Sequence, residues 1–204
     1  FSFMSIGWGC IDGVEVELWG ECYNIEETTE LDLLSSGLTG EIPPEIGNLI
    51  NLTYINLFNN ELTGEIPSQI GDLMFLELLD LGDNNLFGEI PLEIFSLTNL
   101  DILDLHLNEF SGLIPSQIGN LINLNTLYLN NNNLSGEIPT EIENLSNLSW
   151  LYLNDNQLTG EIPVEIGNLM NLTELNLGHN QLTGEIPVSI GNLIELISLN
   201  FENN

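Results

Sequence analysis

The apolar residues of this chain recur with a fixed period of 24 positions. A Gly-x-Ile-Pro motif repeats at that spacing without an insertion, at Gly40, Gly64, Gly88, Gly112, Gly136, Gly160 and Gly184. Each motif follows a short segment in which an apolar, a variable and an apolar residue alternate, and these segments begin at Leu31, Ile55, Leu79, Leu103, Leu127, Leu151, Leu175 and Leu199. Such alternation is typical of a strand with one buried face, and the residues between the apolar ones are expected to be exposed. Because one unit cannot bury its leucines alone, the pattern predicts stacked units whose strands form a parallel sheet.

The residues that follow each predicted strand favour a sharp change of chain direction. An asparagine comes three positions after the second apolar residue of the strand in seven units, at Asn60, Asn84, Asn108, Asn132, Asn156, Asn180 and Asn204. A ladder of asparagine amides can satisfy backbone groups where the chain leaves the sheet. Glycine then allows a close backbone approach, and proline occupies a position that needs no ladder donor. The segment Ile-Gly-Asn-Leu that follows predicts a short helical or 3₁₀ turn on the outer side.

Residues 1–27 depart from the repeat. Val14, Val16 and Leu18 alternate with polar or aromatic residues, which predicts a strand that covers the first edge of the sheet. Cys10 and Cys22 are close in sequence and are the only cysteines. A disulfide between them would indicate an oxidising compartment, and two free thiols are the alternative.

The repeat unit resembles the plant-specific class of leucine-rich repeats, whose pattern is LxxLxLxxNxLxGxIPxxIGxLxxL. The resemblance covers residues 28–204, as seven full units and a partial eighth. The class includes receptor-like kinase ectodomains and polygalacturonase-inhibiting proteins, and similar repeats occur in bacterial and algal secreted proteins. The resemblance implies an α/β repeat solenoid with a parallel sheet on the concave face, 3₁₀ turns on the convex side and a second short strand near Leu-x-Gly-x-Ile-Pro. It also implies ligand binding on the concave face, a secreted or cell-surface location, and an N-terminal cap over residues 1–27 that bears the two cysteines.

The charge of the chain is entirely one-sided, with 31 Asp and Glu residues and no Lys or Arg. Nucleic acids and anionic membranes require clustered basic side chains, so neither is an expected partner. A cationic partner, bound cations or a simply hydrated acidic surface remain as alternatives. One column of glutamates runs through the repeat at Glu41, Glu65, Glu89, Glu137, Glu161 and Glu185, and Leu113 interrupts it.

Acidic residues gather on the third and fourth predicted strands. Glu77, Asp80, Asp83 and Asp104 are near one another in the repeat register, with His106 beside them. Ca²⁺ binds six to eight oxygen ligands, so this group could hold a calcium ion. A hydrated acidic face is the competing interpretation, and no other cofactor is expected.

Aromatic residues gather on the next two strands. Tyr128, Trp150 and Tyr152 are expected on the exposed face, with Asn130, Asn154 and Asp155 as polar neighbours. Tyr and Trp offer large apolar areas with polar tips and are enriched at recognition sites. The group predicts a site for a protein, peptide or carbohydrate ligand, against the alternative of ordinary surface decoration.

No catalytic motif is present, and the chain is not expected to be an enzyme. The rival to ligand recognition is a structural subunit that assembles end to end into filaments. In that hypothesis the apolar Phe1, Phe3 and Met4 of one copy cover the last strand of the next, where Leu199 and Phe201 lie. Truncation of a longer protein is the alternative explanation for the uncovered last strand.

Overall fold

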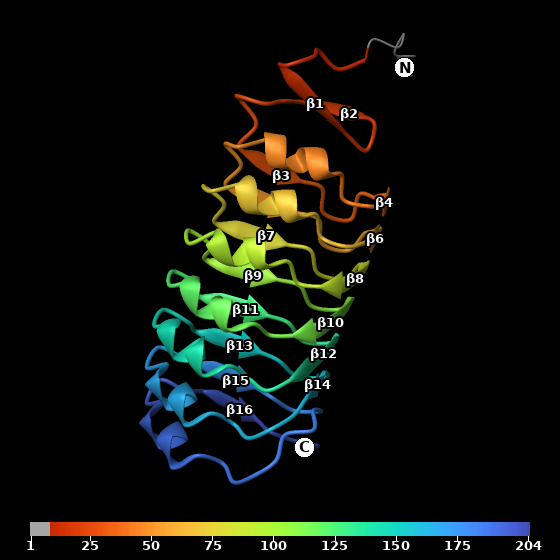
Figure 1. Ribbon diagram of the computed structural model, residues 1–204. Helices are drawn as coiled ribbons and strands as arrows, with labels where there is room; N and C mark the ends of the chain where they lie inside the picture. Colours follow the sequence, from red (N-terminus) through yellow and green to blue (C-terminus); the bar gives the residue numbers. More distant parts are fainter. Residues whose placement is uncertain (1–8) are drawn as a thin grey trace.

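The computed structural model describes residues 9–204, which form a stack of repeating units below a short hairpin (Figure 1). Phe1, Phe3 and Met4, three of the residues predicted to mediate assembly, lie outside the described residues. No helix among the described residues is long and apolar enough to cross a membrane.

One strand of each unit joins a parallel sheet of eight strands, in the order in which they follow one another along the chain. These strands are β3 Glu30–Asp32, β5 Tyr54–Asn56, β7 Leu78–Asp80, β9 Ile102–Asp104, β11 Thr126–Tyr128, β13 Trp150–Tyr152, β15 Glu174–Asn176 and β16 Ser198–Asn200. Each residue pairs with the residue 24 positions later, as Leu127 does with Leu151. The central residue of each of the first seven strands is buried in the core and the two flanking residues point away from it, whereas Leu199 at the centre of β16 is 45% exposed.

Two of these flanking residues are buried, although the register places both on the outer face of the sheet. Thr126 is only 6% exposed, because the larger side chains of Ile102 and Trp150 flank it on the neighbouring strands. Asp104 is 7% exposed and lies against the ring of His106, which belongs to the same unit. The outer face of the sheet is therefore less uniform than the period alone suggests.

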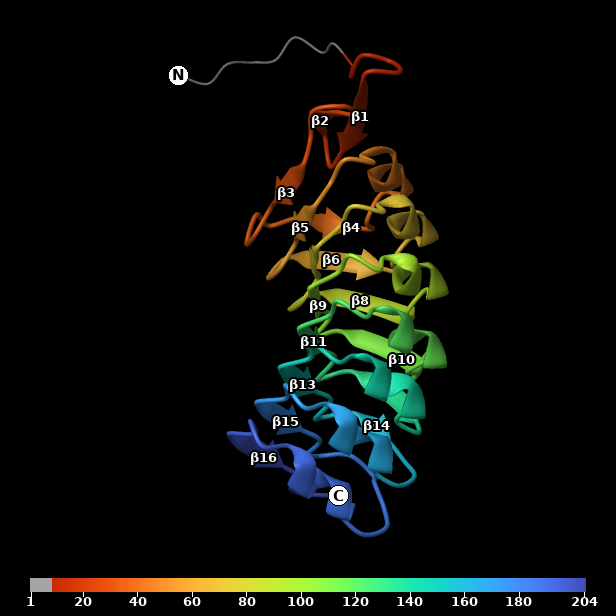
Figure 2. The ribbon, with the colours of Figure 1, turned by 90° about the vertical axis from the view of Figure 1, so that its left-hand side faces the viewer.

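A second parallel sheet and a row of 3₁₀ helices complete each unit. The sheet contains β4 Thr39–Gly40, β6 Glu61–Gly64, β8 Asn85–Glu89, β10 Glu109–Leu113, β12 Asn133–Gly136 and β14 Gln157–Leu158. The helices are η1 Pro44–Asn48, η2 Ser68–Asp72, η3 Leu92–Ser96, η4 Ser116–Asn120, η5 Thr140–Asn144, η6 Val164–Asn168 and η7 Val188–Asn192. The eight-stranded sheet lines the concave side of the solenoid and the helices follow its convex side, as predicted (Figure 2).

The asparagine ladder is present as predicted. Asn132 shows the pattern: its Nδ2 donates to the carbonyl oxygens of Leu129, at 3.2 Å, and of Leu105 in the preceding unit, at 2.9 Å. Its Oδ1 accepts the backbone N–H of Phe110 at 2.9 Å. One side chain thus satisfies backbone groups of two units, and the same set of bonds recurs at the other asparagines of this column.

Every glycine of the Gly-x-Ile-Pro motifs except Gly40 is also required for packing against the preceding unit. Gly64 has φ 85°, in the left-handed region, and a Cβ there would lie 2.8 Å from the Cγ of Glu41, one unit earlier. The stems of five glutamates in this column pack in the same way over the glycine of the following unit: Glu41, Glu65, Glu89, Glu137 and Glu161. At Gly136 the side chain that packs in this way is Leu113, the residue that interrupts the glutamate column.

The N-terminal segment forms a hairpin rather than an extra strand of the solenoid sheet. β1 Glu15–Leu18 pairs antiparallel with β2 Glu21–Asn24, and this two-stranded sheet is separate from the other two. Val16 and Leu18 are buried in the core, whereas Val14 is 45% exposed because it lies in the turn before β1. Cys10 and Cys22 form a disulfide with Cα atoms 5.5 Å apart, which ties the chain before β1 to β2.

Candidate functional site

The concave face carries a continuous row of ring-bearing side chains across the middle units. We call Phe58, His106, Tyr128 and Tyr152 the aromatic row. Tyr128 and Tyr152 are the last residues of β11 and β13 and point away from the core. Phe58 and His106 follow β5 and β9 at the position where a strand leaves the sheet. The row therefore runs across the strands rather than along one of them.

The rings of the aromatic row contact one another in sequence. The Phe58 and His106 rings are stacked with centroids 5.6 Å apart and planes inclined by 27°. Their contact depends on the glycine between them, because a Cβ on Gly82 would lie 2.7 Å from His106 Nδ1. The His106 ring meets Tyr128 edge-on at 6.4 Å, and Tyr128 meets Tyr152 edge-on at 4.9 Å. Edge-to-face packing of this kind holds aromatic side chains in fixed orientations.

A hollow of about 280 Å³ opens on this row. It is lined by His106, Tyr128, Asn130 and Tyr152. The side chains that line it combine ring faces with an imidazole, an amide and two phenols, so it offers both apolar area and hydrogen-bonding groups. Tyr128, Tyr152 and Asn130 were predicted from the sequence as ligand-binding residues, and the structure brings these three together with His106.

The far end of the row is fixed by an acidic side chain. The hydroxyl of Tyr152 donates to Glu174 Oε2 on the neighbouring strand β15. This hydrogen bond, together with burial, raises the pKa of Tyr152 to about 12. Trp150 lies two residues before Tyr152 on the same face of β13 and is 36% exposed, so it adds a further ring beside the row.

Asn154 and Asp155, the other two predicted polar neighbours, are bonded to each other. Asn154 Nδ2 donates to Asp155 Oδ2 at 2.6 Å, and the Oδ1 of Asn154 is buried without a hydrogen-bond partner among residues 9–204. Neither residue lines the hollow. The predicted group therefore divides into a part that lines the hollow and a part that lies beside it.

An aspartate pair adjoins the row at His106. Asp80 and Asp104 are register partners on β7 and β9. The Nδ1 of His106 lies 2.5 Å from Asp104 Oδ1, and this hydrogen bond raises the pKa of His106 against the opposing effect of burial. Burial, with the charge of Asp104, raises the pKa of Asp80 to about 6, although the N–H of Gly82 donates to Asp80 Oδ1 at 2.9 Å. The net charge of the group formed by Asp80, Asp104 and His106 therefore changes at mildly acidic pH.

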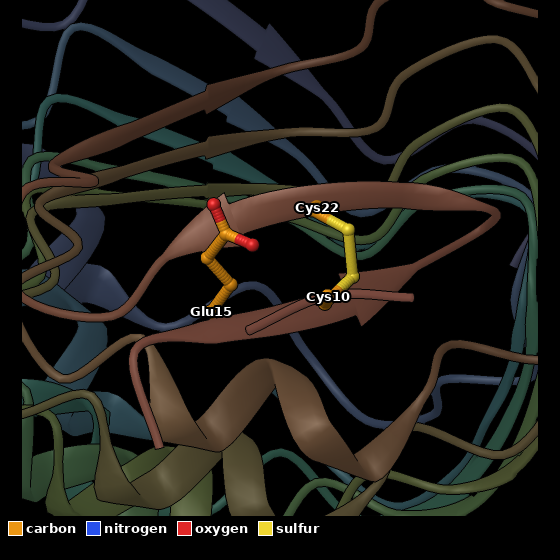
Figure 3. A group of neighbouring side chains, drawn as sticks. All are labelled: Cys10, Glu15 and Cys22. Atoms are coloured by element: carbon orange, nitrogen blue, oxygen red, sulfur yellow. A yellow bond between two sulfur atoms is a disulfide. The ribbon is translucent and has the colours of Figure 1, made fainter. Parts of the chain in front are cut away.

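The four residues predicted to bind calcium are distributed over two places. Asp80 and Asp104 are neighbours and Asp83 occupies the following turn, whereas Glu77 lines a different hollow at the opposite ends of the strands. Among residues 9–204 the close group of three side chains with metal-binding atoms is Cys10, Glu15 and Cys22 (Figure 3). Both sulfurs there form the disulfide, so this group has only the Glu15 carboxylate to offer a cation.

Leu107, which follows His106, has an unusual backbone conformation for its side chain. Its φ is 51°, in the left-handed region, and its side chain is 44% exposed. The equivalent residue in the other units is Ser35, Asn59, Asp83, Asn131, Asp155, His179 or Asn203. Asn, Asp and His tolerate this conformation better than leucine does. Leucine at this place therefore costs conformational energy and exposes apolar surface at the edge of the aromatic row.

The comparisons with known proteins agree with this architecture. Residues 31–148 match a family model described as "Leucine-rich repeat region", and residues 146–187 match one described as "Leucine Rich repeats (2 copies)". The chain belongs to the leucine-rich-repeat family. Its repeats are of the plant type predicted from the sequence. No curated protein matches the chain.

Several solved leucine-rich-repeat structures are similar. PEPR1, solved with AtPEP1, is 37% identical over 86% of this chain and 25% of its own, with a TM-score of 0.84. The ectodomain of the Arabidopsis receptor kinase HAESA, solved with an IDA peptide hormone, is 42% identical over 84% of this chain and 30% of its own, with a TM-score of 0.81. A leucine-rich-repeat protein of Leptospira interrogans is 38% identical over 87% of this chain and 43% of its own, with a TM-score of 0.73. This chain thus spans less than half the length of each of these proteins.

The family sets the broad class of function. Leucine-rich-repeat domains like these ectodomains are usually non-catalytic, in line with the absence of catalytic motifs. The resemblance to extracellular ectodomains and the disulfide are both consistent with an extracellular location.

Proposed function

We propose that this leucine-rich-repeat domain recognises an extracellular peptide, or an extended segment of a protein, on its concave face at the aromatic row. The observation that supports this most strongly is the continuous chain of ring contacts from Phe58 to Tyr152 beside an open hollow. Rings that are already packed against one another lose little conformational entropy when a ligand covers them. Such a surface is suited to recognition.

Two further observations support the same place. Leu107 retains an exposed apolar side chain at a conformational cost, and strained residues of this kind concentrate at functional sites. In addition, the HAESA structure is described as a complex with a peptide hormone, and RGFR1 is described as a plant peptide hormone receptor. Peptides are therefore the class of ligand to test first.

The charge of the site indicates which peptides to expect. Asp80, Asp83 and Asp104 adjoin the row, and the chain contains no Lys or Arg to neutralise them. A basic side chain on the ligand could lie over the aromatic faces and pair with the partly exposed carboxylates of Asp80 and Asp83. The ligand we expect combines an aromatic or aliphatic residue, placed in the hollow, with a neighbouring Lys or Arg.

Selection from a phage-displayed library of random peptides on the disulfide-intact protein tests this function. Selected peptides should be rich in Lys or Arg next to an apolar residue. Their dissociation constants should rise about tenfold or more for Tyr128→Ala and for Trp150→Ala. Val164→Ala on the convex side, where the side chain is 60% exposed, is the matched control and should leave binding unchanged. Peptides that bind the Tyr128 and Trp150 variants as tightly as the unchanged protein would refute the assignment.

A further inference from the structure

A second hollow, larger than the one at the aromatic row, lies on the six-stranded sheet. It has a volume of about 780 Å³ and extends over the units of β4, β6 and β8, between these strands and the prolines that follow them. Its lining combines three carboxylates with apolar side chains: Glu41, Glu65 and Glu89 stand beside prolines, isoleucines and Phe87. We call it the Phe87 groove.

Phe87 makes this part of the sheet different from the other units. The equivalent residue elsewhere is a small hydroxyl-bearing one, at Thr39, Thr63, Ser111, Ser135, Thr159 and Thr183. Phe87 projects outward from β8 and is 47% exposed. It supplies an aromatic wall that the same column lacks in the other units.

The three carboxylates are positioned but have no partner among residues 9–204. The stems of Glu41, Glu65 and Glu89 pack over the glycines of the following units, Gly64 among them. No side-chain hydrogen bond or ion pair within the described residues reaches any of these carboxylates. The whole chain has no Lys or Arg, so any lysine or arginine that pairs with these carboxylates belongs to another molecule.

We propose that the Phe87 groove binds an extended, basic segment of a partner protein, with an aliphatic side chain against Phe87 and flanking lysines or arginines on the glutamate column. Neighbouring strands are about 4.8 Å apart, so Glu41 and Glu89 are separated by roughly 10 Å along the solenoid. Alternate residues of an extended peptide are about 6.6 Å apart on one face, so two basic residues four positions apart span roughly 13 Å. Lysine and arginine side chains are long and flexible enough to reach both glutamates despite the difference between these two spacings.

This surface is independent of the proposed concave site because it belongs to the other sheet. A partner in the Phe87 groove leaves the aromatic row free, so one domain can hold a peptide on its concave face and a protein on its flank. Failure of either proposal would leave the other intact.

The test uses a fluorescently labelled peptide, acetyl-Lys-Ser-Leu-Ser-Lys-Gly-amide, and fluorescence anisotropy at low ionic strength. Phe87→Thr installs the residue found at Thr63 and should weaken binding about tenfold. Glu65→Gln should weaken it about threefold, the size expected for one exposed ion pair. Its matched control is Glu161→Gln, which removes the same charge from the same column where Thr183 stands in place of Phe87. This control should bind the probe as the unchanged protein does.

Two results would overturn the proposal. Equal binding by Phe87→Thr and the unchanged protein would show that the aromatic wall takes no part. Equal weakening by Glu65→Gln and Glu161→Gln would show that the probe responds only to the overall negative charge. Substituting Thr for Phe87 restores the repeat consensus on an exposed surface, so the variant is expected to fold.

Discussion

The left-handed backbone at Leu107 leads to a prediction with an unusual sign. Replacing a side chain by glycine normally destabilises a protein relative to alanine, by about 0.5–1 kcal/mol, because glycine has more conformational freedom to lose. At φ 51° the order should reverse, since alanine pays the cost of the left-handed region and glycine does not. Leu107→Gly is therefore expected to be more stable than Leu107→Ala.

The comparison of these two variants isolates the backbone contribution. Both remove the leucine side chain, which is 44% exposed, so the loss of its packing cancels to first order. The left-handed cost for an L-residue is about 1–2 kcal/mol, and the greater entropy loss of glycine offsets part of it. The free energy of unfolding of Leu107→Gly should therefore exceed that of Leu107→Ala by about 1 kcal/mol. For a chain of this length that corresponds to about 2–4 °C in melting temperature.

Urea denaturation followed by far-ultraviolet circular dichroism measures this difference. The control pair is Val164→Gly and Val164→Ala, at an exposed residue of η6 that does not have a positive φ. There the glycine variant should be the less stable one. A Leu107→Gly variant that is less stable than Leu107→Ala would refute the account of strain, and with it one support for a binding role of Leu107.

Other predictions concern the ladder, the titrating aspartate, the disulfide, calcium and assembly. Asn132→Ala removes a buried side chain that bonds two units and should cost about 2–4 kcal/mol in urea denaturation. The pKa of Asp80 is raised to about 6 because the folded protein favours the neutral carboxyl group. Protonated Asp80 therefore stabilises the fold in acid, and this stabilisation is lost as the pH rises from about 4 to 7. Asp80→Asn should remove that part of the pH dependence of the melting temperature, whereas Asp32→Asn at the exposed equivalent residue of β3 should not. Replacing Cys10 and Cys22 by serine should cost about 2–3 kcal/mol, or less if only the hairpin detaches, and hydrogen exchange would then increase in β1 and β2 alone. If the acidic group binds calcium, millimolar Ca²⁺ should raise the melting temperature, and an unchanged melting temperature would refute calcium binding. If the chain assembles end to end, its sedimentation coefficient should rise with protein concentration, and a constant coefficient would refute assembly.

The period of 24 residues was sufficient to predict the solenoid. It placed the strands of the concave sheet, the asparagine ladder and the short 3₁₀ turns, because each depends on residues that recur in almost every unit. The second sheet followed from the resemblance. Period alone did not predict the burial of Asp104 and Thr126, which depends on the particular neighbours that each has on adjacent strands.

The candidate site was only partly predictable. Tyr128 and Tyr152 belong to one register column and were readily grouped, but Phe58 and His106 belong to the next column and come into contact only because Gly82 separates them. Phe58, Gly82, His106 and Asn130 occupy the same position in successive units, and aligning the units at this position would have indicated the contact between Phe58 and His106. The bond between Tyr152 and Glu174 depends on side-chain rotamers, which the spacing does not determine.

The packing of these glutamate stems over the next unit's glycine means that a mutation can act one unit away from its position in the sequence. A larger side chain at Gly64 would displace the carboxylate of Glu41, which precedes it by 23 residues, and so alter the charge pattern of a unit whose own sequence is unchanged. A systematic mutational scan of this domain should therefore assign surface phenotypes to these glycines as well as to the glutamates that they support. The functional unit that such a scan detects is the junction between two repeats rather than the repeat itself.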